Sequence, residues 1–553
     1  MKRIFFNTCV CAGAALLLSG CIEETFPEGG AATSDQIAES PIATEGMIAS
    51  IPTIMITNYL DLGEHVDFGY PGIMGANDRL AGDVFPVAQN LPGGNQYYDR
   101  WQAWLYPCQS SGLDAASGWS MLHYLNYYQF IKAANDVLAT VGEEESLKES
   151  RGIAKAFRAL FYLDLVRHYD PLPAKAPKLG NYETQRQAVD GLTVPLVTEA
   201  STVDELRNNP RMPREQAFEF IFSDLDDAEA CLANYAPAQK NLPSLAVVYG
   251  LKARAYLWLG QFSDVTYENV PTGEAAYRLA AEYARKAIDA SGCTIMTQAQ
   301  WLDPLTGFNT VNAAWMWAMI QSTDTVLNNL LSWSAHMSLD AMYGYGYLAQ
   351  PGIPSNLYAR IAANDFRRLS FVNPERDWSA FEPYTNLTEE EFQTVAAYAS
   401  TKFHTAGGEK SDYSTANVTS IPLMRVEEMY LTEAEAVAHY DAGQAVSLLE
   451  SFMANRAPGY KVTAENSSGE TLIDEILFQK RIELWGEGLI LFDMKRLNKS
   501  ILNSSNNAPS GARVDTEGRA PWWNQTIPVS IAQRNEILLT TNNPDPCMSY
   551  DAE

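Results

Sequence analysis

Two stretches of the chain carry the residue types that could bind a ligand. The first, residues 77–104, contains Arg79, Asp83, Trp101 and Trp104. Flat aromatic faces recognise both sugar rings and peptide side chains by stacking. The two tryptophans are three residues apart, so on a helix they would share one face. A core contact requires the same spacing, so both interpretations stay open.

The second stretch, residues 333–347, contains Trp333, Tyr343, Tyr345 and Tyr347. The tyrosines alternate with glycine, and in an extended backbone they would face one way. Glycine also lets a backbone come close to a ligand. We therefore expect these residues to contact a ligand, with a tyrosine-rich packing strand or a plain loop as the alternative.

Motifs that mark catalysis are missing from the sequence. It has no H-E-x-x-H, G-x-S-x-G or Gly-rich phosphate loop. No two histidines have ligand spacing, and we expect His168 and His439 to be satisfied residues near helix ends. A glycosidase needs two carboxylates across the scissile bond, and none of the 67 acids is marked as such a pair. We expect a protein without a catalytic site, metal or cofactor.

The N-terminus indicates export. Two basic residues precede an uncharged apolar stretch, residues 4–18, which is too short to span a bilayer and is typical of a secretory signal. Residues 18–21, Leu-Ser-Gly-Cys, resemble the lipobox of bacterial lipoproteins, in which Cys21 carries the acyl chains (palmitate among them). The alternative is an ordinary signal with Cys21 as a free thiol. We expect a signal peptide over residues 1–20 and a lipid anchor at Cys21.

Residues 21–40 have the composition of a flexible tether, with Pro, Gly, Ala, Ser and acids. Glu23 and Glu24 stand directly after the lipidation site, and early acids of this kind resemble a signal for export to the outer face in some diderm anaerobes. No later segment is apolar for long enough to span a membrane. The sequence therefore predicts a protein on the exterior of an outer membrane that contacts lipid through its anchor only.

Charge and composition narrow the function further. Loss of Lys2 and Arg3 with the signal takes the net charge from −28 to −30, and such a polyanion repels nucleic acid. An apolar content of 46% is enough for a large core. Four cysteines remain after the anchor, without the close pairs of metal sites, and both disulfides and free thiols are possible. They are Cys108, Cys231, Cys293 and Cys547.

Helical periodicity dominates the rest of the chain. Apolar residues recur at helical spacing over 119–139, 144–169, 213–232 and 243–260. Pro171 and Pro173 end the second of these, because proline cannot continue a helix. Small residues around 251–288, and again around 429–456, resemble tetratricopeptide repeats, in which Gly and Ala let antiparallel helices approach closely. The pattern predicts a mostly helical protein built from helix pairs. Loop-rich insertions are expected near 65–110, 295–420 and 500–526, where binding residues tend to lie.

Several blocks, in order, resemble the SusD/RagB family of nutrient-binding lipoproteins. They are AFRALFYLDLVRHYDPLP (156–173), the block 211–232, LKARAYLWLG (251–260), IPLMRVEEMYLTEAE (421–435), FQKRIELWGEGLILFDMKRL (478–497), the closing segment 527–545 and, near the front, DFGYP (67–71). The resemblance covers residues 41–553. His168-Tyr169-Asp170 departs from the aromatic-Gly-Asp of many relatives.

The resemblance implies a fold and a function. The fold is an all-helical scaffold of four tetratricopeptide-like pairs with irregular segments packed on one side. Family members cover SusC-like, TonB-dependent transporters and hand them oligosaccharides or, in some branches, peptides, without catalysis. We expect a glycan-binding member of this kind. A peptide-binding member, a surface glycoside hydrolase and a purely structural scaffold are the alternatives.

Charged residues of the 478–497 block have a separate expectation. Recurring charges on a scaffold helix usually bind other helices, so we interpret them as structural, with Glu483 and Glu487 one helical turn apart. The residues concerned are Arg481, Glu483, Glu487, Asp493 and Arg496.

Overall fold

The computed structural model of the chain describes residues 40–546, apart from 63–64, 92–100, 102–104 and 106–112. The predicted signal peptide, Cys21, the tether up to residue 39, Trp104, Cys108 and Cys547 lie outside the described residues. Their predicted roles stay predictions.

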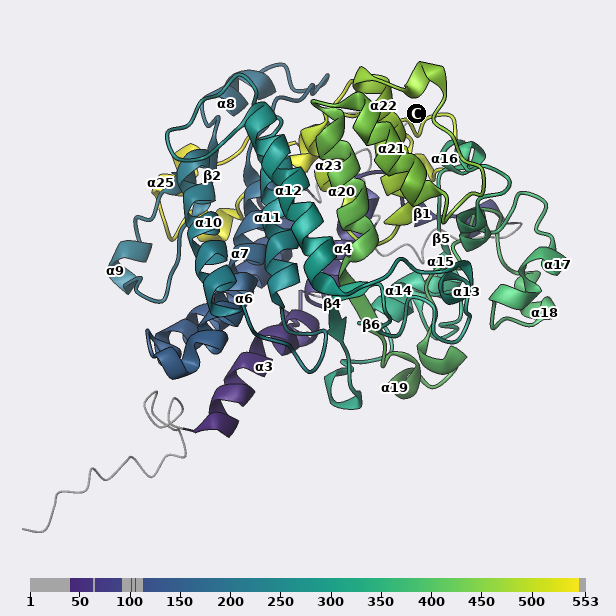
Figure 1. Cartoon of the computed structure of the whole chain (residues 1–553), viewed down its shortest axis with the longest axis horizontal. Helices are drawn as coiled ribbons and strands as arrows, with labels where there is room; N and C mark the ends of the chain where they lie inside the picture. The colour runs from purple at the N-terminus through teal and green to yellow at the C-terminus, as the bar shows by residue number, and fades with distance from the viewer. Residues whose placement is uncertain (1–39, 63–64, 92–100, 102–104, 106–112, 547–553) are drawn as a thin grey trace, which may run out of the picture.

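A row of long antiparallel helices forms the scaffold, and the fold is mostly helical, as predicted. α6 contacts α7, α7 contacts α10, α10 contacts α11 and α11 contacts α12; α12 meets α20, which packs on α21 and α22. Figure 1 shows α10, α11, α12, α20 and α21 running side by side. Their bounds are α6 Gly118–Val141, α7 Lys148–Tyr169, α10 Arg214–Cys231, α11 Leu245–Leu259, α12 Gly273–Ser291, α20 Val426–Ala438, α21 Ala442–Met453 and α22 Gly469–Glu483.

Small residues bring α11 and α12 together, as the repeat-like pattern predicts. Ala280 and Ala284 are fully buried on α12. Gly260 follows the end of α11, and a Cβ atom there would lie 2.3 Å from the ring of Tyr277. Only glycine therefore allows this close approach.

The bounds of α7 agree with the predicted helix at its C-terminal end but not at its start. α7 ends at Tyr169, just before Pro171 and Pro173, as predicted. Its start is later than predicted, since residues 145–147 form a 3-10 turn and the α-helix begins at Lys148. His168 lies near a helix end as expected, one residue before the end of α7, and is fully buried beside His123, with ring centroids 4.4 Å apart. The expectation that it is satisfied was wrong, because neither ring nitrogen has a hydrogen-bond partner within the described part of the chain.

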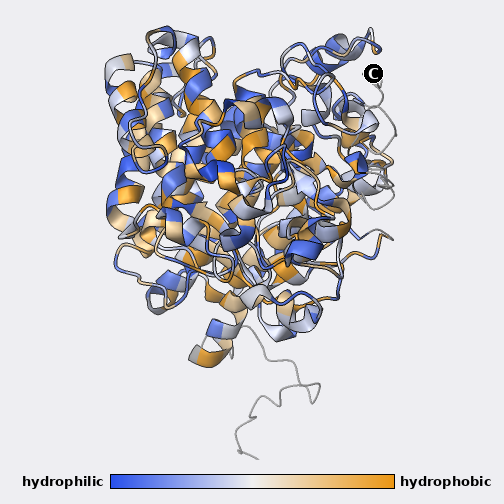
Figure 2. Ribbon diagram, turned by 90° about the vertical axis from the view of Figure 1, so that its right-hand side faces the viewer, coloured by the Kyte–Doolittle hydropathy of each residue, from blue (hydrophilic) through white to orange (hydrophobic). Residues whose placement is uncertain are grey.

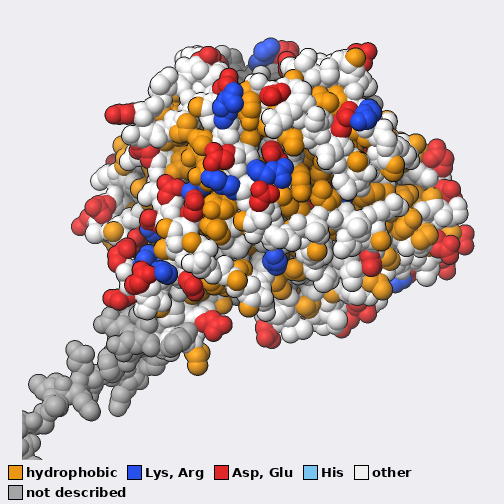
Figure 3. All heavy atoms as spheres, in the orientation of Figure 1, with side chains coloured by type: hydrophobic (Ala, Val, Ile, Leu, Met, Phe, Trp, Pro, Cys, Tyr) orange, Lys and Arg blue, Asp and Glu red, His pale blue; other side chains and the backbone are white. Residues whose placement is uncertain are grey.

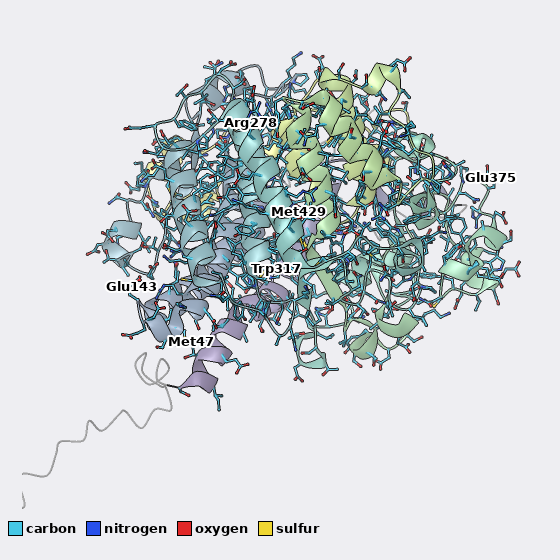
Figure 4. The ribbon with its side chains drawn as sticks, in the orientation of Figure 1. Met47, Glu143, Arg278, Trp317, Glu375 and Met429 are labelled. Carbon is cyan, nitrogen blue, oxygen red and sulfur yellow. The ribbon has the colours of Figure 1, made fainter. Side chains whose placement is uncertain are left out.

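Two paired strands lie at the two ends of most of the segment 295–420 and join it to the helical scaffold. β4 (Trp315–Ile320) pairs antiparallel with β6 (Ser420–Arg425), from Trp315 opposite Arg425 to Ile320 opposite Ser420. α20 follows β6 directly. Trp317 packs 5.0 Å from Phe157 of α7, between ring centroids, and lies at the centre of the molecule in Figure 4.

Apart from two longer helices, α3 and α4, the remaining elements are short. Two further two-stranded sheets pair β1 (Phe85–Pro86) with β5 (Pro351–Gly352) and β2 (Leu192–Pro195) with β3 (Arg211–Pro213). The other helices are α3 Pro41–Thr57, α4 Tyr70–Leu80, α8 Tyr182–Gln187, α9 Val203–Leu206, α13 Gln298–Trp301, α14 Trp333–Met337, α15 Tyr345–Ala349, α16 Ser355–Arg360, α17 Trp378–Phe381, α18 Glu389–Phe392, α19 Tyr413–Ala416, α23 Ile490–Arg496, α24 Val529–Ala532 and α25 Ile537–Thr541.

The predicted loop-rich insertions are therefore partly structured. Residues 65–110 include α4 and β1, and residues 295–420 include β4 and helices α13 to α19. α13 to α18 gather on the right-hand side of Figure 1, beside the helical row. These helices are too short for a clear periodic signal, which is why the sequence indicated loops.

Apolar side chains are buried throughout the molecule. The main cluster of buried apolar residues extends from Ile48 to Leu538. Figure 2 shows hydrophobic positions distributed through the whole body and not gathered in one stripe. Within the described residues, every helix is too short or too polar to cross a membrane.

Candidate functional site

A buried aromatic cluster holds part of the first predicted stretch against the second. The Trp101 Nε1–H donates to His336 Nδ1 at 3.3 Å, and the Phe68 ring stacks on His336 with centroids 4.9 Å apart. His336 Nε2 in turn donates to the carbonyl oxygen of His65 at 2.7 Å. Burial lowers the pKa of His336 to about 3, so the ring is neutral and both nitrogens have fixed roles. Trp101 is only 2% exposed, so in this structure its ring is a packing residue.

Trp333 also lies inside. It is 3% exposed and meets the Phe403 ring edge-on at 5.3 Å. Its helix, α14, begins after Ser332, whose Oγ accepts the backbone N–H of Ala335 at 3.1 Å. A ligand would reach the Trp333 ring only after its packing against Phe403 had opened.

The three alternating tyrosines do not form an extended segment. α15 begins at Tyr345, so Tyr343, Tyr345 and Tyr347 do not share one face as an extended backbone would give. The glycines serve helix packing and not ligand approach, since a Cβ at Gly344 or Gly346 would lie 2.6 Å or 2.2 Å from a backbone oxygen at the end of α14. The extended backbone on which a shared face of the tyrosines depended is therefore not present.

Tyr343 remains accessible and faces a tyrosine that the sequence analysis missed. It is half-buried, and its ring centroid is 6.3 Å from that of Tyr413, the first residue of α19. The Tyr343 hydroxyl donates to Asn417 Oδ1 at 2.6 Å, and Tyr413 is 40% exposed. We call Tyr343 and Tyr413 the tyrosine pair. No motif marked Tyr413, because it is a lone aromatic 70 residues further along the chain.

The other two tyrosines of the segment differ in exposure. Tyr347 is half-buried and its hydroxyl lies 2.9 Å from Thr394 Oγ1. Tyr345 is 9% exposed, and its hydroxyl hydrogen-bonds His65 Nδ1. Tyr347 can thus offer an edge to a ligand, whereas Tyr345 joins the buried cluster.

Arg79 and Asp83 are already engaged within the protein. The Arg79 guanidinium lies 4.7 Å from the centroid of the Trp101 ring and donates to the carbonyl oxygen of Gly75 at 2.7 Å. The Asp83 carboxylate binds both Nε and Nη2 of Arg481 in a fork. In this structure both side chains make contacts within the protein that stabilise the local packing.

The most strongly charged cluster of the interior surrounds Glu483 at the end of α22. Its carboxylate accepts hydrogen bonds from Arg456 at 2.8 and 2.9 Å, from Arg367 at 3.1 Å and from Arg425 at 3.2 Å. Burial raises the pKa of Glu483, but the three guanidiniums outweigh it and hold that pKa well below its usual range. All four side chains are buried, so this cluster is structural, as expected.

Glu487 belongs to the same structural cluster but not to the same helix. It accepts from Lys402 Nζ at 2.7 Å and from Arg425 at 2.9 Å through both oxygens. α22 ends at Glu483, and Gly486 follows with a φ of 76°. The expectation of an i,i+4 pair on one helix was wrong because this left-handed glycine reverses the chain.

The last two charges of the block form a second buried cluster. Asp493 accepts from Lys480 at 2.9 Å and from Arg496 at 2.7 Å, and Arg496 also pairs with Glu435. The expected pairing of Asp493 with nearby cations is confirmed. These contacts tie α22, α23 and α20 together.

One large hollow among the described residues lies away from the tyrosines. It measures about 1230 Å³ and lies between α3 and the α6–α7 turn, lined among others by Ile48, Val141, Glu143 and Tyr235. Figures 1 and 4 show this region, with Glu143 labelled, on the far side of the molecule from α15. The aromatic segment is therefore not identified as the candidate site by the size of a cavity. It is identified by the partial exposure of some of its rings.

Comparisons with known proteins show what this chain is similar to. A family model described as the SusD family matches residues 357–535, which include the Glu483 cluster and Tyr413. This part of the chain is thus similar to the SusD family. A search of curated proteins found no match.

Solved SusD-like structures share the fold over nearly the whole chain. A SusD-like carbohydrate-binding protein of Bacteroides vulgatus is 19% identical with a TM-score of 0.66, the alignment covering 91% of this chain and 98% of the other. A SusD superfamily protein of Bacteroides fragilis is 16% identical with a TM-score of 0.62, covering 91% and 99%. A structure with xylogluco-oligosaccharide is 18% identical with a TM-score of 0.60, covering 89% and 98%.

The described cysteines are free thiols. Cys231 and Cys293 are both half-buried and unpaired. Of the two alternatives left open by the sequence, the thiol state therefore holds for these two residues.

Proposed function

We propose that this chain is a SusD-family cell-surface lipoprotein that binds glycans at the tyrosine pair and delivers them to a SusC-like, TonB-dependent transporter. The observation that carries the proposal is a pair of tyrosine rings at the surface, one half-buried and one 40% exposed, in a chain with this fold. Tyr413 offers an open ring face, and Tyr343 stands beside it.

The chemistry of the pair suits a sugar. A pyranose presents an apolar face that stacks on an aromatic ring and hydroxyls that hydrogen-bond at the edges. The rings of Tyr343 and Tyr413 supply the stacking surface, and the Tyr343 hydroxyl, which donates to the buried Asn417 Oδ1, supplies a polar atom at its side. Tyr347 extends the same segment by one helical turn. Two of the similar structures are described as carbohydrate-binding or contain an oligosaccharide, which supports glycans over peptides.

Hydrolysis is disfavoured by the state of the nearby acids. A glycosidase needs one carboxylic acid that stays protonated near neutral pH. Glu409 and Asp412 precede Tyr413 closely in the chain, and hydrogen bonds lower the pKa of both, so both remain ionised. Neither can act as a general acid, and we propose a binding protein.

Anchoring and delivery follow from the N-terminus. Cys21 would carry acyl chains that hold the protein on the outer membrane, with residues 22–40 as the tether. A lipid-anchored binder has no channel of its own, so a captured glycan needs a neighbouring transporter. The SusC-like transporter is the partner that the family resemblance implies.

Affinity electrophoresis tests the proposal. The protein would start at residue 22, which retains every residue that the structure describes, and would run through gels containing plant, host or microbial polysaccharides. New reducing ends would be measured on the same samples. We expect retardation by at least one glycan without cleavage.

Matched variants locate the site. Tyr413→Ala and Tyr343→Ala should each weaken retardation, because loss of a stacking ring costs about 1–2 kcal/mol, or roughly tenfold in affinity. Tyr440→Ala is the control, since Tyr440 is a half-buried tyrosine on the scaffold after α20. Equal losses in all three variants would contradict the proposed site. Cleavage products would contradict a binding role, and retardation by peptides but no glycan would point to the peptide-binding alternative.

A further inference from the structure

The carboxylates beside the tyrosine pair indicate which glycans fit there. We propose that Glu409 and Asp412 form a fixed negative rim at this site, so that it accepts glycans without anionic groups and rejects those with carboxylate or sulfate. This inference rests on the proposed function and specifies its ligand class.

Hydrogen bonds hold both carboxylates of the rim in place. Glu409 Oε1 accepts the backbone N–H of Ser411 at 2.8 Å and that of Asp412 at 3.0 Å. Asp412 caps α19, accepting the N–H of Ser414 at 3.1 Å, its hydroxyl at 2.6 Å and the Thr415 hydroxyl at 3.0 Å. These donors lower the pKa of both acids, so the rim stays charged at neutral pH without needing a cation.

The rim lies beside the tyrosine pair, because the backbone N–H of Met342, next to Tyr343, donates to the carbonyl oxygen of Lys410 at 3.2 Å. Asp412 directly precedes Tyr413 in the chain. Burial, followed by the charges of Asp340, Glu409 and Asp412, raises the pKa of the Tyr343 phenol. The phenol is therefore in a negative potential, and an anionic group of a ligand would meet the same field.

A neighbouring lysine does not neutralise the rim. Lys410 lies between the two acids in sequence, but its ammonium binds both oxygens of Glu391, at 2.8 and 2.7 Å. Its charge is thus shared with a third carboxylate.

Acidic side chains elsewhere on the surface add to the negative charge of the molecule. Figure 3 shows acidic side chains along the right-hand edge of the molecule, over α17 and α18, where Glu375 points outward in Figure 4. The whole chain carries a net charge of −28. A like charge about 4–6 Å from two fixed carboxylates at physiological salt should lose roughly tenfold in affinity.

Paired polymers test the inference. Neutral glucans, xyloglucan and galactomannan, each beside its carboxymethylated form, would be compared in affinity gels with the protein from residue 22 onward. We expect retardation by a neutral polymer and at least tenfold weaker retardation by its carboxymethylated form. The difference should shrink at 1 M salt, where the Debye length falls to about 3 Å.

A charge-neutral rim gives the decisive variant. Glu409→Gln with Asp412→Asn removes both negative charges. It keeps amide oxygens that can accept from the backbone N–H groups of Ser411, Asp412 and Ser414, and only the Thr415 hydroxyl loses its acceptor. The variant should reduce the ratio of neutral to carboxymethylated affinity about tenfold. The control is Asp264→Asn with Glu268→Gln, two exposed acids in the loop between α11 and α12 that give the same change in net charge. It should leave both affinities unchanged.

The outcomes separate the two proposals. Equal or tighter binding of the carboxymethylated polymer by the unmodified protein would overturn the rim while leaving glycan binding intact. An equal fall in this affinity ratio for the control variant would also overturn it, because net charge alone would then explain the selectivity. Retardation by no polymer, neutral or charged, would refute the proposed function and this inference with it.

Discussion

Removing one negative charge from the Glu483 cluster should destabilise the protein without touching its ligand site. Glu483→Gln keeps the shape of the side chain but leaves three buried guanidiniums, of Arg367, Arg425 and Arg456, with one carboxylate fewer. Breaking a buried ion pair by removing one partner costs about 3–5 kcal/mol, because the remaining charge is buried without compensation. We expect a loss of this size in the free energy of unfolding.

The size of the effect can be read in a melting experiment. An unfolding entropy of about 2.1 cal/mol/K per residue gives roughly 1.2 kcal/mol/K for 553 residues. The expected loss therefore lowers the midpoint by about 3–4 °C. Differential scanning calorimetry measures this shift, and urea unfolding gives the free energy independently.

A surface pair provides the control. Glu450→Gln removes the partner of Lys461, whose side chain is 76% exposed, at an N–O distance of 2.6 Å. Exposed pairs contribute about 0–1 kcal/mol, so the midpoint should move by less than about 1 °C. Equal shifts in the two variants would refute the view that the Glu483 cluster is a stabilising network. A loss of glycan retardation by folded Glu483→Gln protein would refute its purely structural role.

Two further predictions concern acid and backbone geometry. Burial lowers the pKa of three fully buried histidines, His123, His168 and His336. Only the unfolded chain protonates them below pH 6.5, so stability falls as the pH falls. Burial raises the pKa of Asp78 to about 8, and the proton that the folded state binds there opposes this loss. Together these four groups give a net loss of about 2 kcal/mol in the free energy of unfolding from pH 7 to 5.5, and urea midpoints that stay constant or rise as the pH is lowered would contradict it. Gly486→Ala would place a Cβ 2.5 Å from the Phe403 ring at a φ of 76°, and should lower the free energy of unfolding, measured in urea, by about 2–4 kcal/mol. Gly459→Ala is the control: it has a similar φ but open space around it, and should cost less.

Helix positions were predictable from sequence where the chain repeats a physical pattern. α6, α10 and α11 lie within a few residues of their predicted ranges, because apolar residues recur once per turn over many turns. The short helices α13 to α19 have four to six residues, which is too few for a period to appear. That part of the fold depends on contacts with the scaffold, which a linear pattern does not show.

The candidate site was predictable only in part, for a different reason. Aromatic residues at regular spacing attract attention whether their rings are buried or exposed. Trp101 and Trp333 are buried, whereas Tyr343 is accessible, and no local pattern separates these cases. Tyr413 pairs with Tyr343 across 70 residues of sequence, so only the folded chain reveals the contact.

The buried charges and the tyrosine pair are linked through one segment, residues 402–404. Lys402 donates to Glu487 and to the backbone oxygens of Glu483 and Trp485 at 2.7–3.0 Å, which fixes the segment on the end of α22. The next residue, Phe403, packs on Trp333 at the start of α14. Residues 402–404 therefore connect the ionic cluster to α14, which precedes Tyr343 in the chain.

The link continues to the α14–α15 turn. His404 hydrogen-bonds Asp340 at 2.8 Å, in the turn that leads from α14 to Tyr343. The tyrosine pair therefore stands on contacts that lead back to the ionic core. A binding surface made of half-exposed rings loses little freedom on binding when its support is already rigid, and that lowers the entropic cost of capturing a flexible glycan. The buried charges make no contact with the ligand, so a variant of the Glu483 cluster that remains folded should keep its affinity for the glycan.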